Sequence, residues 1–239
     1  MKKLILFFAF LVGAVIPSGG QNSVNQPEER AGAERPSKPI YLAVQGSILL
    51  SVNENVFSYV DNRRIPDLLT PQGGLQLGYY FTNNWSMRLA AYFGQNASAA
   101  NTVDTAAHGF YPYKFKSANF FLDVVFDFLS RGDAEKLRTF YPRIYFGLGY
   151  AHTFGFTDSG HPWQKIDPVN NEFGFRLGFM GEFAVNRTFS FFFDLCGEGY
   201  GDQYNGLQPS VEDQNKKQGY AGFPLDLRFV ASLGVIFHF

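Results

Sequence analysis

The sequence predicts an all-β protein, a closed eight-stranded antiparallel up-and-down transmembrane β-barrel. Three observations predict this fold. Apolar residues alternate with small, polar or charged residues in eight segments, which is the period of a β-strand. Most segments have about the ten residues that a tilted strand needs to cross the hydrocarbon layer of a membrane. Short and long connections alternate between them, as in barrels whose short turns all lie on one side of the membrane.

The N-terminus predicts a secretory signal peptide over residues 1–20. Lys2 and Lys3 precede the apolar run Leu4–Ile16, and small residues follow it up to Gly20. A charged start, a short apolar run and a small-residue cleavage site are the features of a cleaved signal. Residues 21–38 are rich in Glu, Pro, Gly and Arg without apolar periodicity, which predicts a disordered periplasmic segment. The barrel then occupies residues 39–239.

Eight segments carry the alternation. In chain order they are Ile40–Val52, Gly74–Phe81, Trp85–Phe93, Ala118–Phe128, Arg143–Tyr150, Glu172–Val185, Phe189–Glu198 and Leu225–Phe239. The apolar positions of these segments include no charged residue, and an Arg or Lys facing lipid near the midplane would cost about 2–4 kcal/mol. Because no water reaches unpaired backbone groups inside a bilayer, the sheet must close on itself.

The connections predict the orientation in the membrane. Thr82–Asn84 and Asn186–Thr188 are tight, Asn-rich turns, whereas segments such as Asn53–Pro71, Gln95–Lys116 and Tyr200–Phe223 are long. Outer-membrane barrels keep short turns in the periplasm and long loops outside. The sequence therefore predicts a bacterial outer-membrane location with both termini in the periplasm.

The opposite set of alternating positions is rich in charge. It contains Arg88, Asp123, Asp127, Arg143, Glu172, Arg176, Glu182, Asp194, Glu198, Asp226 and Arg228. An eight-stranded barrel is only wide enough for side chains to fill it, and an arginine can bond two carboxylates at once. We therefore predict a lumen plugged by salt bridges. Paired carboxylates that serve acid–base catalysis or a proton path are the alternative interpretation.

Composition argues against several other functions. The net charge of -1 offers no basic face for nucleic acid, and the single cysteine, Cys196, excludes an internal disulfide. The four histidines have no metal-site spacing, and no Ser-His-Asp set is visible. We expect no metal, no cofactor and no enzyme activity, although His108, Asp158, Ser159 and His161 could imitate a catalytic set in the loops.

The C-terminal stretch GVIFHF contains Val235, Phe237 and Phe239 and resembles the terminal aromatic signal that the barrel-assembly machinery reads. The eight-strand layout resembles the OmpA/OmpX-type small barrels. More narrowly, Phe120–Phe154 resembles the OmpA-like barrels of Bacteroidetes, in which an aspartate-containing strand leads through a short periplasmic link into an aromatic-Pro strand. Such proteins usually add a peptidoglycan-binding domain, whereas this sequence ends at the barrel. The resemblance implies outer-membrane lipid, lipopolysaccharide and the barrel-assembly machinery as partners.

These observations predict a small outer-membrane barrel with a structural or surface-interaction role, whose long extracellular loops offer a surface to a ligand or partner protein. A narrow porin for small solutes is one alternative, and a membrane-embedded enzyme that modifies lipid or lipopolysaccharide is another. The stretch Val103–Ala107 also matches an Asp-Thr-small pattern for O-glycosylation, at Thr105.

Overall fold

The computed structural model describes residues 38–52, 69–101, 110–131, 139–156, 169–201, 204 and 225–239. The predicted signal peptide, nearly all of the segment 21–38 and the residues Thr105, His108, Asp158, Ser159 and His161 lie outside these ranges. Within them, no helix is long and apolar enough to cross a membrane.

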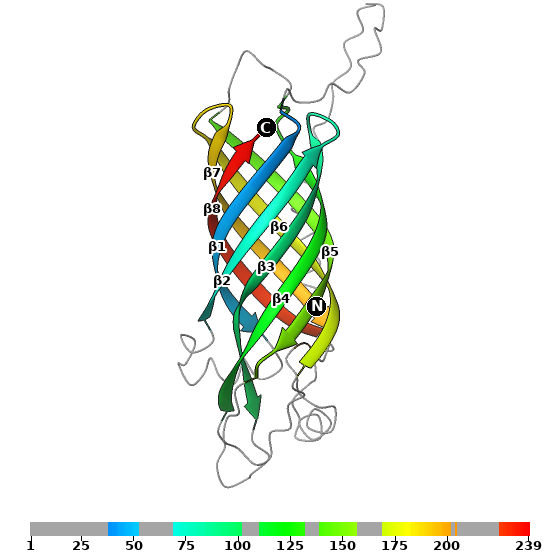
Figure 1. Ribbon diagram of the computed structural model, residues 1–239, viewed down its shortest axis with the longest axis vertical. Coiled ribbons are helices and arrows are strands. Elements are labelled where there is room, and N and C mark those ends of the chain that lie inside the picture. Colours follow the sequence, from blue (N-terminus) through cyan, green and yellow to red (C-terminus); the bar gives the residue numbers. More distant parts are fainter. Residues whose placement is uncertain are drawn as a thin grey trace, which may run out of the picture. The chain divides into compact units, whose positions relative to one another are not determined.

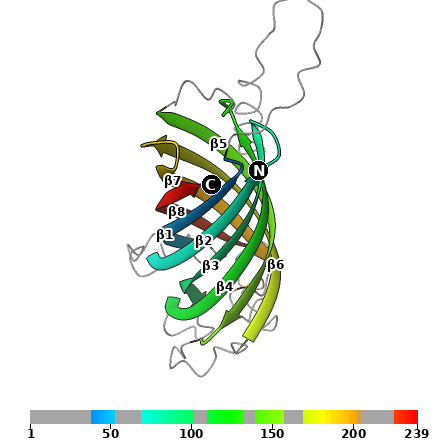
Figure 2. The same cartoon turned by 45° about the horizontal axis from the view of Figure 1, so that its top comes forward.

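Eight strands form one closed antiparallel sheet (Figure 1). They are β1 (Ile40–Val52), β2 (Leu69–Tyr80), β3 (Trp85–Asn101), β4 (Phe110–Asp127), β5 (Phe140–Phe154), β6 (Val169–Ala184), β7 (Phe189–Gly201) and β8 (Leu225–His238). Each strand pairs with the next, and β8 pairs with β1 from Tyr41 opposite His238 to Val52 opposite Leu227. The predicted fold class is confirmed. The strands run obliquely around the cylinder in both cartoon views (Figure 2).

The two ends of the barrel differ in their connections. At one end lie the four-residue turns 81–84 and 185–188, the described residues 128–131 and 139 of the link between β4 and β5, and the described chain ends Lys38 and Phe239. In the second turn, Asn186 Oδ1 accepts hydrogen bonds from the backbone N–H groups of Thr188 and Phe189, at 2.8 and 2.9 Å. This side-chain bonding is why Asn suits so tight a turn. We call this the turn end, and the opposite end the loop end.

Strands β3 and β4 extend further than the sequence predicted. The segment Gln95–Lys116 was expected to be a loop, but the ladder continues to Asn101 opposite Phe110. The residues from Asn96 to Asn101 are small or polar and show no apolar alternation, so the sequence pattern does not reveal this extension. Backbone pairing does not require apolar side chains. One consequence is that Lys114 and Lys116 are exposed on the outside of the barrel wall.

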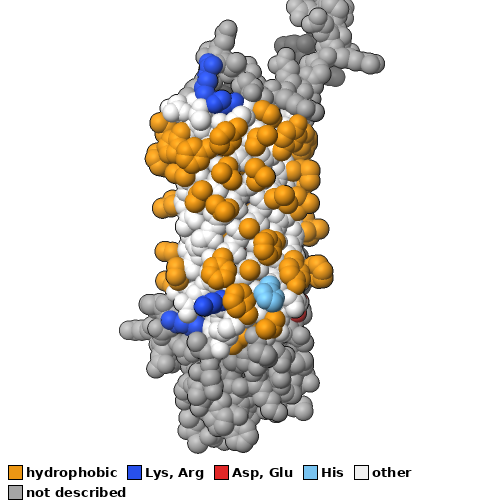
Figure 3. Space-filling view, viewed as in Figure 1, with side chains coloured by type: hydrophobic (Ala, Val, Ile, Leu, Met, Phe, Trp, Pro, Cys, Tyr) orange, Lys and Arg blue, Asp and Glu red, His pale blue; other side chains and the backbone are white. Residues whose placement is uncertain are grey.

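Burial separates the two faces of the wall. In β3, Arg88 is fully buried whereas Met87 and Leu89 are exposed, and the same alternation follows the other strands. On the face that Figure 3 shows, hydrophobic side chains cover the wall, and Lys and Arg appear only toward its two ends. Within the described ranges, every Asp and Glu occupies a lumen-facing position.

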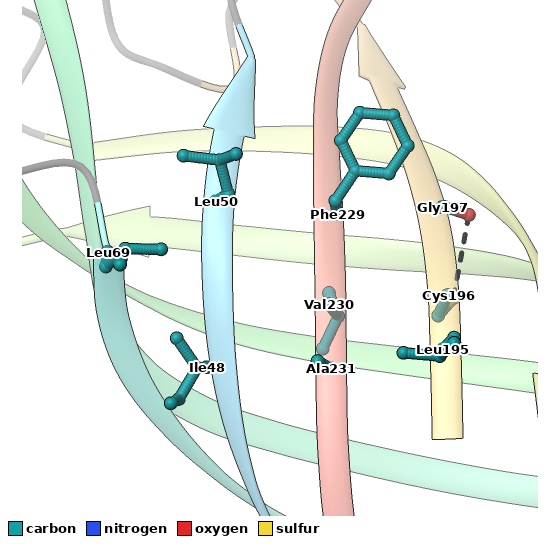
Figure 4. Close-up of a pocket in the computed structure, with 9 residues that line it drawn as sticks. All are labelled: Ile48, Leu50, Leu69, Leu195, Cys196, Gly197, Phe229, Val230 and Ala231. Atoms are coloured by element: carbon teal, nitrogen blue, oxygen red, sulfur yellow. Dashed lines mark hydrogen bonds between the residues drawn. The ribbon is translucent and has the colours of Figure 1, made fainter. Parts of the chain in front are cut away.

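The outer wall carries shallow apolar hollows where small residues stand between large ones. One lies across β1, β2, β7 and β8, between Leu50 and Leu69 on one side and Leu195 and Phe229 on the other (Figure 4). Gly197 and Ala231 are the small residues of its lining. A second hollow is lined by side chains such as Leu77 and Leu89. These hollows suit flexible hydrocarbon chains, since they offer almost no polar groups.

Candidate functional site: the charged lumen

Ionic side chains fill the lumen in three clusters at successive levels. The central cluster consists of Arg88, Asp123, Tyr145, Arg176 and Asp194. The turn-end cluster consists of Asp127, Arg131, Arg143, Glu182, Ser190 and His238, and the loop-end cluster of Asn96, Glu198, Tyr200, Tyr204 and Arg228. The four strand arginines are at most 1% exposed, so each charge depends on its protein partners and not on water.

In the central cluster, the Asp123 carboxylate binds two arginines. Arg88 lies directly opposite Asp123 in the β3–β4 ladder, and its Nε donates to Oδ2 at 2.6 Å. Arg176 reaches the same carboxylate from β6, with Nε to Oδ1 at 2.7 Å and Nη2 to Oδ2 at 2.5 Å. The contact of Arg176 with both carboxylate oxygens is bidentate, a geometry that favours arginine over lysine.

A glycine makes this contact across strands feasible. Gly147 of β5 lies between Asp123 of β4 and Arg176 of β6 in the two ladders. A Cβ atom at position 147 would lie 2.0 Å from Asp123 Oδ1, which is closer than real contacts allow. Without a side chain there, the carboxylate lies over the β5 backbone and meets the guanidinium two strands away.

The second carboxylate of the central cluster, Asp194, pairs with a phenol. The Tyr145 hydroxyl lies 2.8 Å from Asp194 Oδ1 and 2.9 Å from Oδ2. The Arg88 guanidinium carbon stacks 4.1 Å from the centre of the Tyr145 ring. Two arginines and two carboxylates thus balance in charge, and the aromatic ring gives the buried cation a further favourable contact.

In the turn-end cluster, one carboxylate joins four parts of the chain. Glu182 of β6 accepts hydrogen bonds from Arg143 of β5 and from Arg131 in the link between β4 and β5. The Ser190 hydroxyl donates to Glu182 Oε1 at 2.7 Å, and His238 Nε2 lies 2.9 Å from the same oxygen. Because a carboxylate accepts only, this contact assigns a proton to His238 Nε2.

The other acid of this cluster, Asp127, pairs with the same two arginines. Its Oδ1 lies 2.7 Å from Arg143 Nε and 3.5 Å from Arg131 Nε. The Arg131 guanidinium also stacks 4.2 Å from the centre of the Tyr141 ring. Arg131 therefore folds from the link into the mouth of the barrel, where it closes the turn end together with these partners.

In the loop-end cluster, Arg228 is the central donor. Its Nε donates to Glu198 Oε2 at 3.0 Å, its Nη1 to Asn96 Oδ1 at 2.7 Å and its Nη2 to the Tyr200 hydroxyl at 2.9 Å. Arg228 also donates to the hydroxyl of Tyr204, a residue of the connection after β7. Burial raises the pKa of Tyr204 to about 12, although the charge of Arg228 opposes the shift. The hydroxyl therefore stays protonated and bonds Asn96 Oδ1 at 3.3 Å.

Aromatic rings fill the rest of the loop-end mouth. The rings of Tyr200 and Tyr204 stack with centres 4.1 Å apart, and Phe115 meets Tyr204 edge-on at 5.6 Å. Phe156, just after β5, stacks on Phe115 at 4.9 Å. Both tyrosines belong to the segment Tyr200–Phe223 that the sequence predicts to be a loop, and both are buried. Their apolar ring faces pack inside the barrel while their hydroxyls find polar partners.

The structure brings nine of the eleven candidate charged residues into these clusters. Glu172 is half-buried near Gly201, and Asp226 is buried opposite Tyr200, both toward the loop end. Sequence reasoning missed Arg131, because it lies in a link without periodicity. It also missed Asn96, which lay in a segment predicted to be a loop. Tyr145 could have been found, since it alternates in register with Arg143.

Two further groups of candidates occupy other positions. Val235, Phe237 and Phe239, the predicted assembly signal, lie at the turn end of β8, with Phe237 and Phe239 exposed on the outer wall. Among the described residues, no group of three His, Cys, Asp or Glu side chains is arranged to hold a metal ion.

The fold and the ion-paired lumen together define a small eight-stranded barrel of the outer-membrane type. Several crystal structures share this fold. Neisserial surface protein A (NspA) matches with a TM-score of 0.51 and 11% identity, over 84% of this chain and 97% of that one. The outer membrane protein OprG from Pseudomonas aeruginosa matches with a TM-score of 0.50 and 12% identity, over 86% of this chain and 98% of that one.

Sequence comparisons add no closer relative. No protein-family model matches the chain, and no curated protein matches it significantly. At identities of 11% and 12%, the likeness to NspA and OprG establishes the fold alone. The narrower resemblance to Bacteroidetes barrels stays a prediction.

Proposed function

We propose that this protein is a bacterial outer-membrane barrel with a plugged lumen and a structural or surface-interaction role. The burial of its arginines is the observation that carries the proposal. Arg88, Arg143, Arg176 and Arg228 are at most 1% exposed, and all contact carboxylates within the barrel. A porin would keep such groups in contact with water along a channel, as wider barrels do.

The apolar outer wall supports the membrane location. Exposed Leu, Ile, Val and Phe side chains cover positions on all eight strands. In water so extensive an apolar surface would drive aggregation, whereas acyl chains cover it and fill its hollows. Each exposed CH₂ group transferred from water contributes about 0.8 kcal/mol, so the sum over the wall is large.

The turn end faces the periplasm in this proposal. Short turns and both described chain ends lie there, which agrees with export through the predicted signal peptide. The residues Val235, Phe237 and Phe239 then present their side chains to the barrel-assembly machinery during insertion. A cysteine at Asn186 should resist a membrane-impermeant maleimide in intact cells and react after lysis. Labelling in intact cells would contradict this orientation.

The experiment that tests the closed lumen is single-channel recording of the pure protein in planar bilayers. We expect no steady conductance steps, because salt bridges and aromatic rings fill the lumen in three clusters. A heat-dependent shift in gel mobility verifies that the inserted protein is folded. Steady open steps from folded protein would support the narrow porin instead.

The connections at the loop end are the proposed interaction surface. In this orientation they lie outside the cell, and loops carried by a rigid scaffold are common places for binding residues. Cross-linking in intact cells followed by isolation of the outer membrane should recover a reproducible partner. Recovery of the uncross-linked barrel alone would favour the purely structural role.

A further inference from the structure

We propose that the outer wall at the loop end binds a phosphate-bearing lipid of the outer leaflet, of the lipid A type, through Lys114 and Lys116. This site rests on the proposed function, which places the loop end at the outer surface of the membrane. Its ligand lies outside the barrel and has no contact with the ion pairs of the lumen.

The distribution of charge sets these two lysines apart. Within the described ranges, five arginines and all the carboxylates belong to the lumen, while Lys38 and Arg187 lie at the turn end. Lys114 and Lys116 are the remaining described cations, and both project from the outer face of β4. Residues two apart on one face of a strand stand roughly 7 Å from each other, so both can approach one phosphorylated headgroup.

The height of Lys116 on the wall corresponds to a headgroup level. At about 3.4 Å per residue and a tilt of about 40°, the strand from Lys116 to Phe126 rises roughly 26 Å along the barrel axis. The apolar band of such barrels is about 25 Å tall. Phe126 packs against Trp85 at 4.8 Å, an aromatic pair of the kind that marks a membrane interface. Lys116 therefore lies at the opposite interface, and Lys114 lies further out.

Polar side chains on β5 and β6 lie close to this level. Asn171 Oδ1 accepts from the Tyr150 hydroxyl at 2.5 Å and lies 2.8 Å from His152 Nδ1. Because an amide oxygen accepts only, Nδ1 carries the proton, and His152 Nε2 remains for another partner. His152 stands opposite Ala118 in the ladder, two residues from Lys116 on the same face of β4. Such polar groups would be costly in hydrocarbon, which supports a headgroup position.

Aromatic rings surround this polar level. Phe154 packs 6.2 Å from Phe93 and 5.4 Å from His152, and Phe173 meets Tyr150 at 5.9 Å. Phe173 is 80% exposed. Figure 3 shows cationic and histidine side chains among hydrophobic ones near the lower end of the described wall. A lipid of the lipid A type matches both halves of this surface, because its phosphates can lie near the lysines and its acyl chains against the rings. A soluble polyanion would leave the aromatic half unused.

The test is a titration of the full-length folded protein, in detergent micelles, with bisphosphorylated lipid A. Bound lipid is counted by native mass spectrometry. The double variant Lys114→Gln/Lys116→Gln should bind about 30-fold more weakly, since each lysine near an anionic membrane surface contributes about fivefold. The control Lys38→Gln/Arg187→Gln removes the same charge at the turn end and should bind normally. An equal loss in both variants would overturn the site.

Two further arms distinguish the source of the phosphate and the role of the rings. Dephosphorylated lipid A should bind weakly. Inorganic phosphate should not compete with lipid A for the site at lipid concentrations that saturate the protein. The variant Phe173→Ala should bind lipid A severalfold more weakly. Competition by inorganic phosphate, or unchanged binding by Phe173→Ala, would overturn the lipid assignment. Folded, membrane-inserted protein without lipid A preference contradicts only this inference, whereas failure to insert contradicts the proposed function.

Discussion

The central cluster and the two end clusters of the lumen differ in where their side chains come from. Arg88, Asp123 and Arg176 all belong to strands, and the barrel itself holds them in register. The turn-end cluster needs Arg131 from the link after β4, and the loop-end cluster needs Tyr204 from the connection after β7. The middle of the plug is therefore a property of the strands, while each mouth also depends on a connection.

The comparison explains how a short barrel can close both of its mouths. Near each end, strand residues already bond the outermost carboxylate or amide, Glu182 or Asn96. A residue from a connection supplies a further donor, which is Arg131 for Glu182 and Tyr204 for Asn96. Buried polar groups are costly until they are fully paired, so these contacts stabilise the connections as well as the plug.

The largest expected effect is that of Asp123→Asn in the central cluster. The change leaves Arg88 and Arg176 buried without their shared negative charge, which should lower the free energy of unfolding by about 3–5 kcal/mol. Urea unfolding in detergent, under conditions where unfolding and refolding coincide, measures this change. Asp194→Asn is the matched control: it also removes one negative charge from the cluster, but its amide oxygen can still accept from Tyr145, so a smaller loss is expected. Equal losses in both variants would show that the bonds of Asp123 to the two arginines add no stability beyond its charge.

A smaller loss is expected from Gly147→Ala. The new Cβ would lie 2.0 Å from Asp123 Oδ1 and displace the carboxylate from Arg176. Overpacking of this kind costs about 1–3 kcal/mol, to be measured in the same unfolding experiment. Gly46→Ala is the control, since no atom lies within 4 Å of its added Cβ. If the two alanine variants were equally stable, the contact from β4 to β6 would not depend on the glycine.

The smallest expected effect is that of Tyr204→Phe at the loop-end mouth. The ring stays stacked on Tyr200, but the bonds to Arg228 and Asn96 are lost, which should cost about 0.5–1.5 kcal/mol. The loss should show as faster proteolysis of the 202–224 connection, with little change in the urea midpoint of the barrel. A large fall in that midpoint would mean that the mouths and the centre form one unit, contrary to the comparison.

Sequence periodicity predicted the strands and the lumen-facing positions because both follow from one two-residue repeat. It could not predict which charges pair across the lumen. Arg176 stands opposite Glu198 in the ladder but bonds Asp123, a choice that depends on the tilt of the strands and on Gly147. Arg131 and Tyr204 carried no periodic signal. The apolar pattern places Lys114 and Lys116 in a loop, because the pairing of β3 with β4 continues beyond the residues that show this pattern.

Glu182 has a consequence for the mechanics of the cylinder. His238, which bonds it, is the last residue of β8, and β8 meets β1 along the seam that joins the beginning of the sheet to its end. The same carboxylate bonds groups on β5 and β7 and in the link after β4. Opening the seam at this mouth would therefore strain the bond between His238 and Glu182, which lies two strands away on β6. The last strand is thus held to the wall by more than its own backbone ladder.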